Sequence, residues 1–192
     1  RYVPMRREFA CCRQEVLAKR VARSGRINRI LVSCGSTDPD NVTCTVLNGI
    51  QLSRFQGSVD VVLGAWAPHI CKVKEKVAHM TNAVLYTDVP NMHSFLYMAD
   101  IAIGAAGTSS WERCCLGLPS IMLQTAPNQR ENIRDLVNAK AALYACKENH
   151  AIAEKVDYLC NRGDVVCEMI EKAANMCDGQ GAGRVVQKVR NV

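Results

Sequence analysis

One stretch of this 192-residue sequence combines small residues, hydroxyls and a carboxylate: Gly104-Ala105-Ala106-Gly107-Thr108-Ser109-Ser110-Trp111-Glu112. Small residues let backbone amides approach an anion, and the hydroxyls of Thr108, Ser109 and Ser110 would add hydrogen-bond donors. The spacing matches neither the GxGxxG pattern of dinucleotide sites nor the GxxxxGK[ST] loop of NTPases. Gly107 to Ser110 are therefore expected to bind phosphate in some other way.

Glu112 has two interpretations. The spacing from Ser109 to Glu112 is typical of a capping box, in which the carboxylate accepts a hydrogen bond from the backbone amide of the cap residue. A carboxylate can also bind two adjacent ribose hydroxyls, because it accepts two hydrogen bonds. The spacing alone favours the cap and leaves the ribose interpretation open.

A second loop of small residues follows the apolar run at residues 30–32. Its candidate contacts to a phosphate or sugar are Gly35, Ser36 and Thr37, since a glycine permits a tight turn and a close approach. Asp38 before Pro39 predicts a helix start, with Asp as the cap and Pro at the first helical position. A plain capped turn is the alternative.

Asn128 and Gln129 follow another apolar run, residues 120–123. Two adjacent amides there would suit sugar hydroxyls, but Asn128 with Glu131 also fits a cap and its third helical residue. The pattern leaves the two interpretations nearly even.

A fourth loop follows the run at residues 83–86. It is either a connector or the place where a flat base meets backbone groups. Its candidate residues are Thr87, Asp88 and Val89.

The cysteines and histidines predict no metal site. Eleven cysteines is an odd number, and no CxxC pair occurs among them, which argues against disulfides and structural zinc. We expect reduced thiols in a cytosol, most of them buried among apolar residues. The histidines have no obvious partner at ligand spacing, and no triad or carboxylate pair is recognisable, so neither a metal nor another cofactor is expected.

These loops need a scaffold, and the apolar runs predict one. Short runs alternate with helix-like segments, which indicates βαβ units: an α/β fold with a Rossmann-like parallel sheet and helices on both faces. Ligands bind such sheets at the carboxyl ends of the strands, where all four loops begin. Helices are expected to start near Asn149, Asp164 and Gln180. The predicted strands are residues 30–32, 59–63, 83–86, 101–103, 120–123 and 142–144.

Charge divides the chain unevenly. The formal net charge is +6, and residues 1–29 carry nine Lys or Arg against two Glu. We expect a basic, partly helical lead-in or interdomain segment over 1–26, either solvated or facing a missing part, and one domain over 27–192. Aromatic residues make up 5%, too few for a typical nucleic-acid surface. No apolar run approaches the roughly 18 residues of a membrane span, and no signal peptide is apparent.

Residues 101–119 closely resemble the signature of the UDP-sugar hydrolases of bacterial pseudaminic acid biosynthesis. The matching sequence is Ile101-Ala102-Ile103-Gly104-Ala105-Ala106-Gly107-Thr108-Ser109-Ser110-Trp111-Glu112-Arg113-Cys114-Cys115-Leu116-Gly117-Leu118-Pro119. The first-strand loop is similar too, although the family more often has Gly-Gly-Ser-Asp-Pro there. Asn128-Gln129-Arg130 and residues 178–185 also fit. A weaker resemblance extends to the glycosyltransferase that adds N-acetylglucosamine to lipid I and to spore-coat polysaccharide proteins.

This resemblance implies the carboxyl-terminal half of a two-domain GT-B fold, in a bacterial cytoplasmic enzyme. In that family the loop after the fourth strand meets the diphosphate of UDP, and the loop after the third strand meets uracil. A Glu at the position of Glu112 holds the ribose, and Asn128 matches a residue facing the sugar. The missing amino-terminal half would supply the catalytic base, so no catalytic residue is expected in this chain.

Three functions therefore remain in order of preference. The first is the UDP-sugar-binding half of a hydrolase that releases UDP from a diacetamido-trideoxy-hexose. The second is the donor-binding half of a glycosyltransferase, whose acceptor is a hydroxyl instead of water. The third is a stand-alone nucleotide-sugar binding module or a degenerate subunit, which the missing initiator Met disfavours. The expected partners are UDP or a UDP-sugar and the amino-terminal domain, with no nucleic acid.

Overall fold

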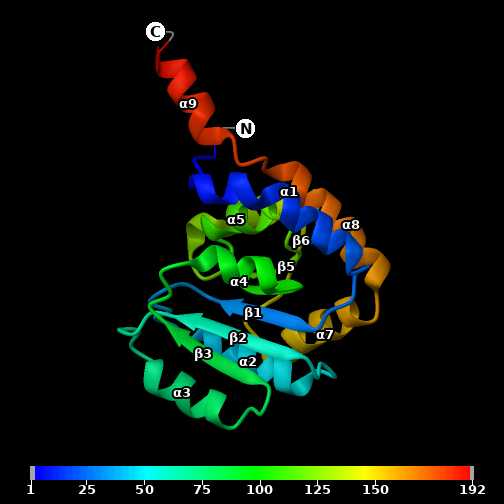
Figure 1. Ribbon diagram of the computed structural model, residues 1–192. Helices are drawn as coiled ribbons and strands as arrows, with labels where there is room; N and C mark the ends of the chain where they lie inside the picture. Colours follow the sequence, from blue (N-terminus) through cyan, green and yellow to red (C-terminus); the bar gives the residue numbers. More distant parts are fainter. Residues whose placement is uncertain (1–2, 191–192) are drawn as a thin grey trace.

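The computed structural model describes residues 3–190, and Figure 1 shows a sheet between two layers of helices. Six parallel strands have the order β3-β2-β1-β4-β5-β6. All six predicted strands are confirmed, and so is the α/β fold class. The strands are β1 (Arg29–Ser33), β2 (Ser58–Leu63), β3 (Ala83–Thr87), β4 (Ile101–Ala105), β5 (Ser120–Leu123) and β6 (Ala142–Tyr144).

A helix precedes the first strand, others connect successive strands, and the rest follow the last strand. Helices near Asn149, Asp164 and Gln180 are confirmed by α7, α8 and α9. The helices are α1 (Arg7–Ala22), α2 (Val42–Leu52), α3 (Ile70–Ala78), α4 (Met92–Met98), α5 (Ser109–Cys115), α6 (Arg130–Asn138), α7 (Asn149–Cys160), α8 (Gly163–Met176) and α9 (Gly181–Arg190), with a 3-10 turn η1 (Pro127–Gln129). None of those nine helices is both long and apolar enough to cross a bilayer.

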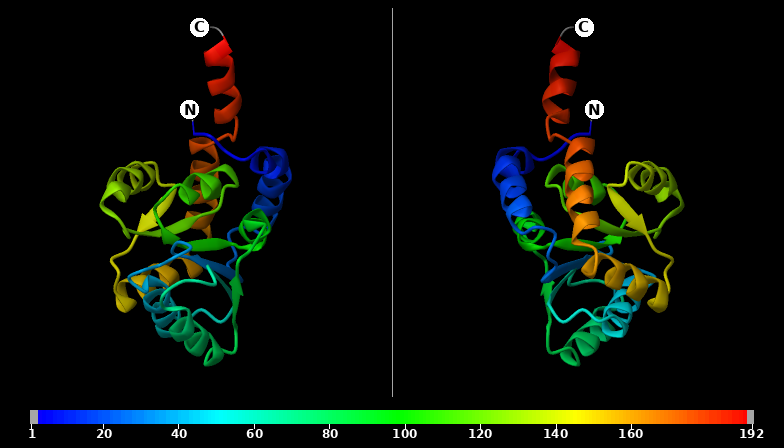
Figure 2. Two further views of the ribbon diagram at one scale, coloured as in Figure 1. Left: turned by 90° about the vertical axis from the view of Figure 1, so that its left-hand side faces the viewer. Right: turned by 90° about the vertical axis from the view of Figure 1, so that its right-hand side faces the viewer.

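The core has two halves, one on each face of the sheet, because neighbouring strand residues point to opposite faces. Ile101 and Ile103 of β4 pack with α2, α3 and α7, whereas Ala102 packs with α1, α4, α5 and α6. Every residue of β4 is buried. The two views of Figure 2 show helices on both sides of the sheet and α9 projecting away from the body. Burial on both faces explains why the strands appear in the sequence as continuous apolar runs.

The lead-in segment is not simply a solvated helix. α1 packs against α4, α5 and α8, and Phe9, Val16 and Arg20 on it are buried. The Arg20 guanidinium donates hydrogen bonds to the backbone carbonyls of Leu116, at 2.7 Å, and Ala99, at 2.6 Å. It also donates to the carbonyl of Leu96. Burial lowers the pKa of Arg20 to about 9, so the group is still charged at neutral pH.

Most cysteines lie elsewhere than expected. Only four are buried: Cys34, Cys114, Cys115 and Cys177. The expectation that most thiols are buried was therefore wrong, because several cysteines fall on the outer faces of helices. None of the eleven forms a disulfide in the structure as described over 3–190.

Candidate functional site

The candidate site lies where β1 and β4 run side by side. From this pair the chain continues outward in opposite directions, to β2 and β3 on one side and to β5 and β6 on the other. Open parallel sheets bind ligands at such a switch point, outside the carboxyl ends of the strands. A cleft of about 630 Å³ occupies this position. Its lining includes Gly35, Ser36, Thr37, Gly107, Thr108, Ser109, Thr125 and Gln129.

The loop after β1 has a different turn from the one its sequence predicted. The Asp38 carboxylate accepts hydrogen bonds from the backbone amides of Val42, at 2.9 Å, and Thr43, at 2.8 Å, so it does cap a helix. However, α2 begins at Val42, and Pro39 is not its first residue. The difference arises because Asp38 and Asn41 both have positive φ, which inserts an extra turn before the helix. Gly35, Ser36 and Thr37 remain on the cleft wall.

The loop after β4 presents backbone donors to the cleft. In the structure of residues 3–190, the amides of Gly107, Thr108 and Ser109 donate to no protein acceptor. Ser110 is turned inward, where its hydroxyl donates to the Gly107 carbonyl at 2.6 Å. Ser110 is therefore buried beneath the loop and shapes it. Three unpaired amides side by side form a place where an anion can bind.

The predicted capping box between Ser109 and Glu112 is wrong. α5 begins at Ser109, and no side chain caps it. The Glu112 carboxylate instead lies 3.5 Å from Arg6 Nη2 in the lead-in segment. Arg6 also pairs with Glu8 at 3.0 Å. Glu112 lines neither the main cleft nor the smaller hollow beside the loop after β3, and its side chain is 21% exposed.

The loop after β5 closes the cleft with Gln129. The Oε1 atom of this side chain accepts hydrogen bonds from the Thr125 amide at 2.9 Å and from the Thr125 hydroxyl. Asn128 is exposed, does not line the cleft and forms no cap, because η1 and then α6 begin in its place. The interpretation of Asn128 as a cap, one of the two that the sequence left open, is therefore wrong. Of the two predicted amides, only Gln129 borders the cleft.

The loop after β3 borders a second hollow of about 250 Å³, whose lining shares Gly35, Ser36 and Ser109 with the main cleft. Asp88 and Val89 line it, whereas Thr87 does not. The Asp88 carboxylate accepts a hydrogen bond from the Ala65 amide at 3.1 Å, which ties the loops after β2 and β3 together. The two hollows are neighbours, because residues of the loops after β1 and β4 line both.

Sequence reasoning missed Arg113. This side chain is buried under the loop after β4, and its Nη2 atom donates to the Ala105 carbonyl at 2.7 Å and to Ser110 Oγ at 3.3 Å. Burial lowers the pKa of Arg113. The available signal was a basic residue among the apolar residues that follow Glu112.

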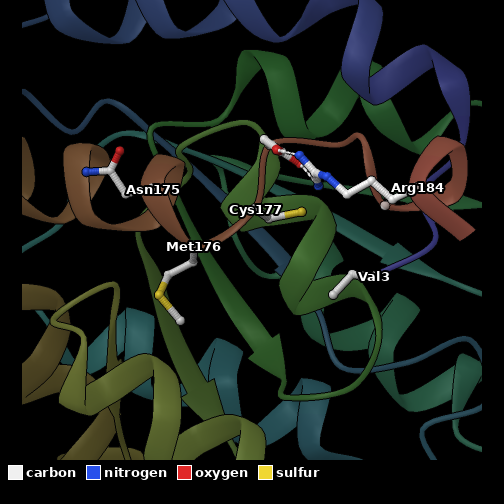
Figure 3. A pocket seen from close by; sticks show the side chains of 7 residues that line it. Val3, Asn175, Met176, Cys177 and Arg184 are labelled. Carbon is white, nitrogen blue, oxygen red and sulfur yellow. Dashed lines mark hydrogen bonds and ion pairs between the residues drawn. The ribbon is translucent and has the colours of Figure 1, made fainter. Parts of the chain in front are cut away.

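Another hollow, of about 400 Å³, lies between the start of the chain and the connection from α8 to α9. Figure 3 shows Val3, Asn175, Met176, Cys177 and Arg184 around it. Arg184 forms an ion pair with Asp178. This hollow contains none of the predicted site residues. Over residues 3–190, no three His, Cys, Asp or Glu side chains are grouped so as to hold a metal ion.

The family model for the glycosyltransferase family 28 C-terminal domain matches residues 29–183. The protein MJ1062 of Methanocaldococcus jannaschii is 26% identical over 182 residues, which cover 92% of this chain and 37% of that protein. The UDP-N-acetylglucosamine–N-acetylmuramyl-(pentapeptide) pyrophosphoryl-undecaprenol N-acetylglucosamine transferase of Caldanaerobacter subterraneus is 26% identical over 203 residues, which cover 98% of this chain and 55% of the transferase. The chain thus spans between about a third and somewhat over half of these relatives.

Among solved structures, the chain is similar to that of MnaA from S. aureus in complex with UDP. The TM-score is 0.71 at 12% identity, and the match covers 89% of this chain and 46% of MnaA. At this identity the likeness supports the fold alone. It agrees with the sheet order and the layers described above.

Proposed function

This chain belongs to the glycosyltransferase family 28 C-terminal domain family, and from that premise we propose that it binds the UDP part of a UDP-sugar donor. The proposal divides the chain into a lead-in segment over 1–26 and a nucleotide-binding domain over 27–192. It makes the chain the carboxyl-terminal half of a two-domain enzyme. The short coverage of its relatives is consistent with a second domain.

The observation that carries this proposal is the row of unpaired amides at Gly107, Thr108 and Ser109. A leaving diphosphate needs its negative charge stabilised, and preorganised backbone donors do this without reorganisation. The hydroxyls of Ser36, Thr37 and Thr108 line the same cleft and would add donors to the remaining phosphate oxygens.

The other parts of the ligand are assigned from the two neighbouring hollows. Uracil would lie in the smaller hollow against Asp88 and Val89, with Thr87 at its edge. Glu112 would hold the ribose once its carboxylate leaves Arg6, which requires little free energy because a partly exposed ion pair at 3.5 Å is weak. Gln129, with Asn128 next to it, would face the sugar.

The reaction we propose is transfer of the sugar from UDP to the hydroxyl of an acceptor molecule, with the acceptor bound and the catalytic base supplied by the amino-terminal domain. The family membership and the transferase relative support this function. A second candidate is hydrolysis of a UDP-diacetamido-trideoxy-hexose, which the sequence of residues 101–119 favours. The two reactions are distinguished by product analysis on the two-domain enzyme with and without a hydroxyl acceptor.

Calorimetric titration of the chain with UDP, CMP and ADP tests the binding function. We expect UDP to bind most tightly, and Glu112→Gln to weaken it by about 1.5–3 kcal/mol through loss of charge-assisted hydrogen bonds. The matched control is Glu154→Gln, which changes an exposed carboxylate on α7 and should leave UDP affinity unchanged. Equal affinities for all three nucleotides would contradict the uracil assignment, and no binding at millimolar nucleotide would contradict the proposal as a whole.

A further inference from the structure

Arg113 is a buried cation without an anionic partner. Its exposed fraction is 2%, and no carboxylate within residues 3–190 forms an ion pair with it. Its hydrogen bonds go to one carbonyl and one hydroxyl, both neutral. The Nε atom is buried and has no hydrogen-bond partner. A buried charge in this state is costly for the fold.

The groups around Arg113 do not neutralise it. The Cys34 and Cys114 thiols lie near it, and burial raises the pKa of each to about 12, so both are uncharged at neutral pH. The Glu112 carboxylate forms no ion pair with Arg113 and contacts Arg6 instead. The Asp38 carboxylate is occupied by the amides that start α2. The local charge is therefore positive.

This positive charge lies at the switch point of the sheet. A Cβ atom added to Gly104 would be 3.3 Å from Arg113 Nη1 and 1.9 Å from the Ser33 carbonyl oxygen. The guanidinium thus lies against the boundary between β1 and β4, beneath the two loops that form the main cleft. A Cβ atom at position 104 would overlap the Ser33 carbonyl, so only glycine permits the close approach of β1 and β4 there.

Arg113 also shapes the loop that would hold an anion. Its Nη2 atom bonds the Ala105 carbonyl and the Ser110 hydroxyl, and that hydroxyl in turn bonds the Gly107 carbonyl. These bonds turn the carbonyls of Ala105 and Gly107 inward, toward the cation. The amides of the same loop are left without protein acceptors, at the cleft.

From this arrangement we propose that Arg113 is a positioning residue for a diphosphate, a role that rests on the proposed function. It supplies the buried positive charge under the cleft and holds the loop after β4 in its anion-binding shape. The ligand chemistry it selects is a doubly charged diphosphate rather than the nucleoside attached to it. The anion in turn compensates a charge that the protein itself leaves unpaired.

The test measures calorimetric affinities of the 192-residue chain for UDP, inorganic pyrophosphate and uridine. The variants are Arg113→Met and Arg113→Gln, which remove the charge, and Arg113→Lys, which keeps it. Neutral variants should lose on the order of tenfold or more in affinity for UDP and pyrophosphate, but less than about twofold for uridine. Arg113→Lys should recover most of the affinity and keep its dependence on salt.

Arg20→Met is the matched control, because Arg20 is an equally buried guanidinium that does not line the cleft. It should leave the ratio of UDP to uridine affinity unchanged. Circular dichroism identifies the folded variants, and Arg113→Gln carries the comparison if Arg113→Met does not fold. The proposal is overturned if a folded neutral variant keeps the wild-type ratio, or if Arg113→Lys loses as much affinity as the neutral variants.

The same titrations separate this proposal from the proposed function. Wild-type chain that binds pyrophosphate without preferring uracil nucleotides would overturn the UDP assignment and leave Arg113 in its role. If the wild-type chain binds UDP and the Arg113 variants bind it equally well, the role of Arg113 is overturned and the UDP assignment stands. Wild-type chain that binds neither ligand would overturn both.

Discussion

Buried charged groups have different partners at the two ends of the sheet. At the amino end, the Asp100 carboxylate accepts hydrogen bonds from the amides of Asn28, at 2.8 Å, and Arg29, at 2.9 Å, and forms an ion pair with Arg23 at 2.7 Å. Arg20 donates to three carbonyls at the ends of α4 and α5. At this end the Asp100 carboxylate thus has a cationic partner, and every guanidinium nitrogen of Arg20 donates to a backbone carbonyl.

At the carboxyl end, strong polar groups remain unpaired. Arg113 has a free Nε and no carboxylate, and the amides of Gly107 to Ser109 have no protein acceptor in the chain as described. Arg20 and Arg113 are thus the same residue type at the same degree of burial, with different surroundings. Between these two arginines the difference is the pairing of the guanidinium nitrogens, rather than burial or residue type: each nitrogen of Arg20 donates a hydrogen bond, whereas Arg113 Nε does not.

Replacing Asp100 should give the largest loss of stability and leave UDP binding unchanged. We expect Asp100→Ala to lower the free energy of unfolding by about 3–5 kcal/mol, because Arg23 and two amides lose their partner. Urea denaturation measures the loss, and UDP affinity of the folded fraction should not change. Asp135→Ala, at an exposed carboxylate on α6, is the control. A loss below about 1 kcal/mol for Asp100→Ala would show that the amino end does not depend on this pairing.

Alkaline pH should destabilise the protein through thiols at the carboxyl end of the sheet. The folded pKa of Cys34 and of Cys114, about 12, lies above the ordinary thiol value of 9.0. The unfolded chain therefore loses these protons first. The stability contribution is complete below pH 9 and is lost as pH rises toward 12, at about 1.4 kcal/mol per pH unit for each thiol.

Urea denaturation at several pH values between 8 and 11 measures this slope. Cys34→Ala should reduce the slope of the free energy of unfolding against pH by the contribution of one thiol. Cys167→Ala, at an exposed position on α8, should leave the slope unchanged. An unchanged slope in Cys34→Ala would mean that this thiol ionises normally in the folded protein.

The smallest expected effect on stability is at Gly107, where a substitution should weaken UDP binding but hardly affect folding. A Cβ atom on Gly107 would meet only Gln129 Nε2, at 3.8 Å, so Gly107→Ala should change the free energy of unfolding by less than about 0.5 kcal/mol. Its methyl group would crowd the unpaired amides and weaken UDP binding by about tenfold at most. Gly104→Ala is the contrasting variant, since its Cβ would overlap the Ser33 carbonyl and destabilise the fold. Unchanged UDP affinity in Gly107→Ala would place the phosphates elsewhere.

The sequence predicted the strands because strands buried on both faces are continuous apolar runs. It also predicted which loops gather at one edge, because all strands of a parallel sheet end there. The sequence did not predict the hydrogen-bond partners of the site residues correctly. Glu112 fitted a cap at a spacing of three residues, whereas its partner Arg6 lies 106 residues away. The burial of Arg113 and the incomplete burial of most cysteines depend on helix packing, which no local pattern contains.

The register of the sheet has a consequence for folding. Ile30 pairs with Ile101, so the pairing of β1 with β4 closes a loop of 71 residues, whereas every other pairing in the sheet joins consecutive strands. Closing long loops costs entropy and is slow, and the cleft between these two strands is complete only after that step. A diphosphate bound there would hold together the sheet's most sequence-distant contact. It would therefore slow unfolding of the domain more than it would speed folding.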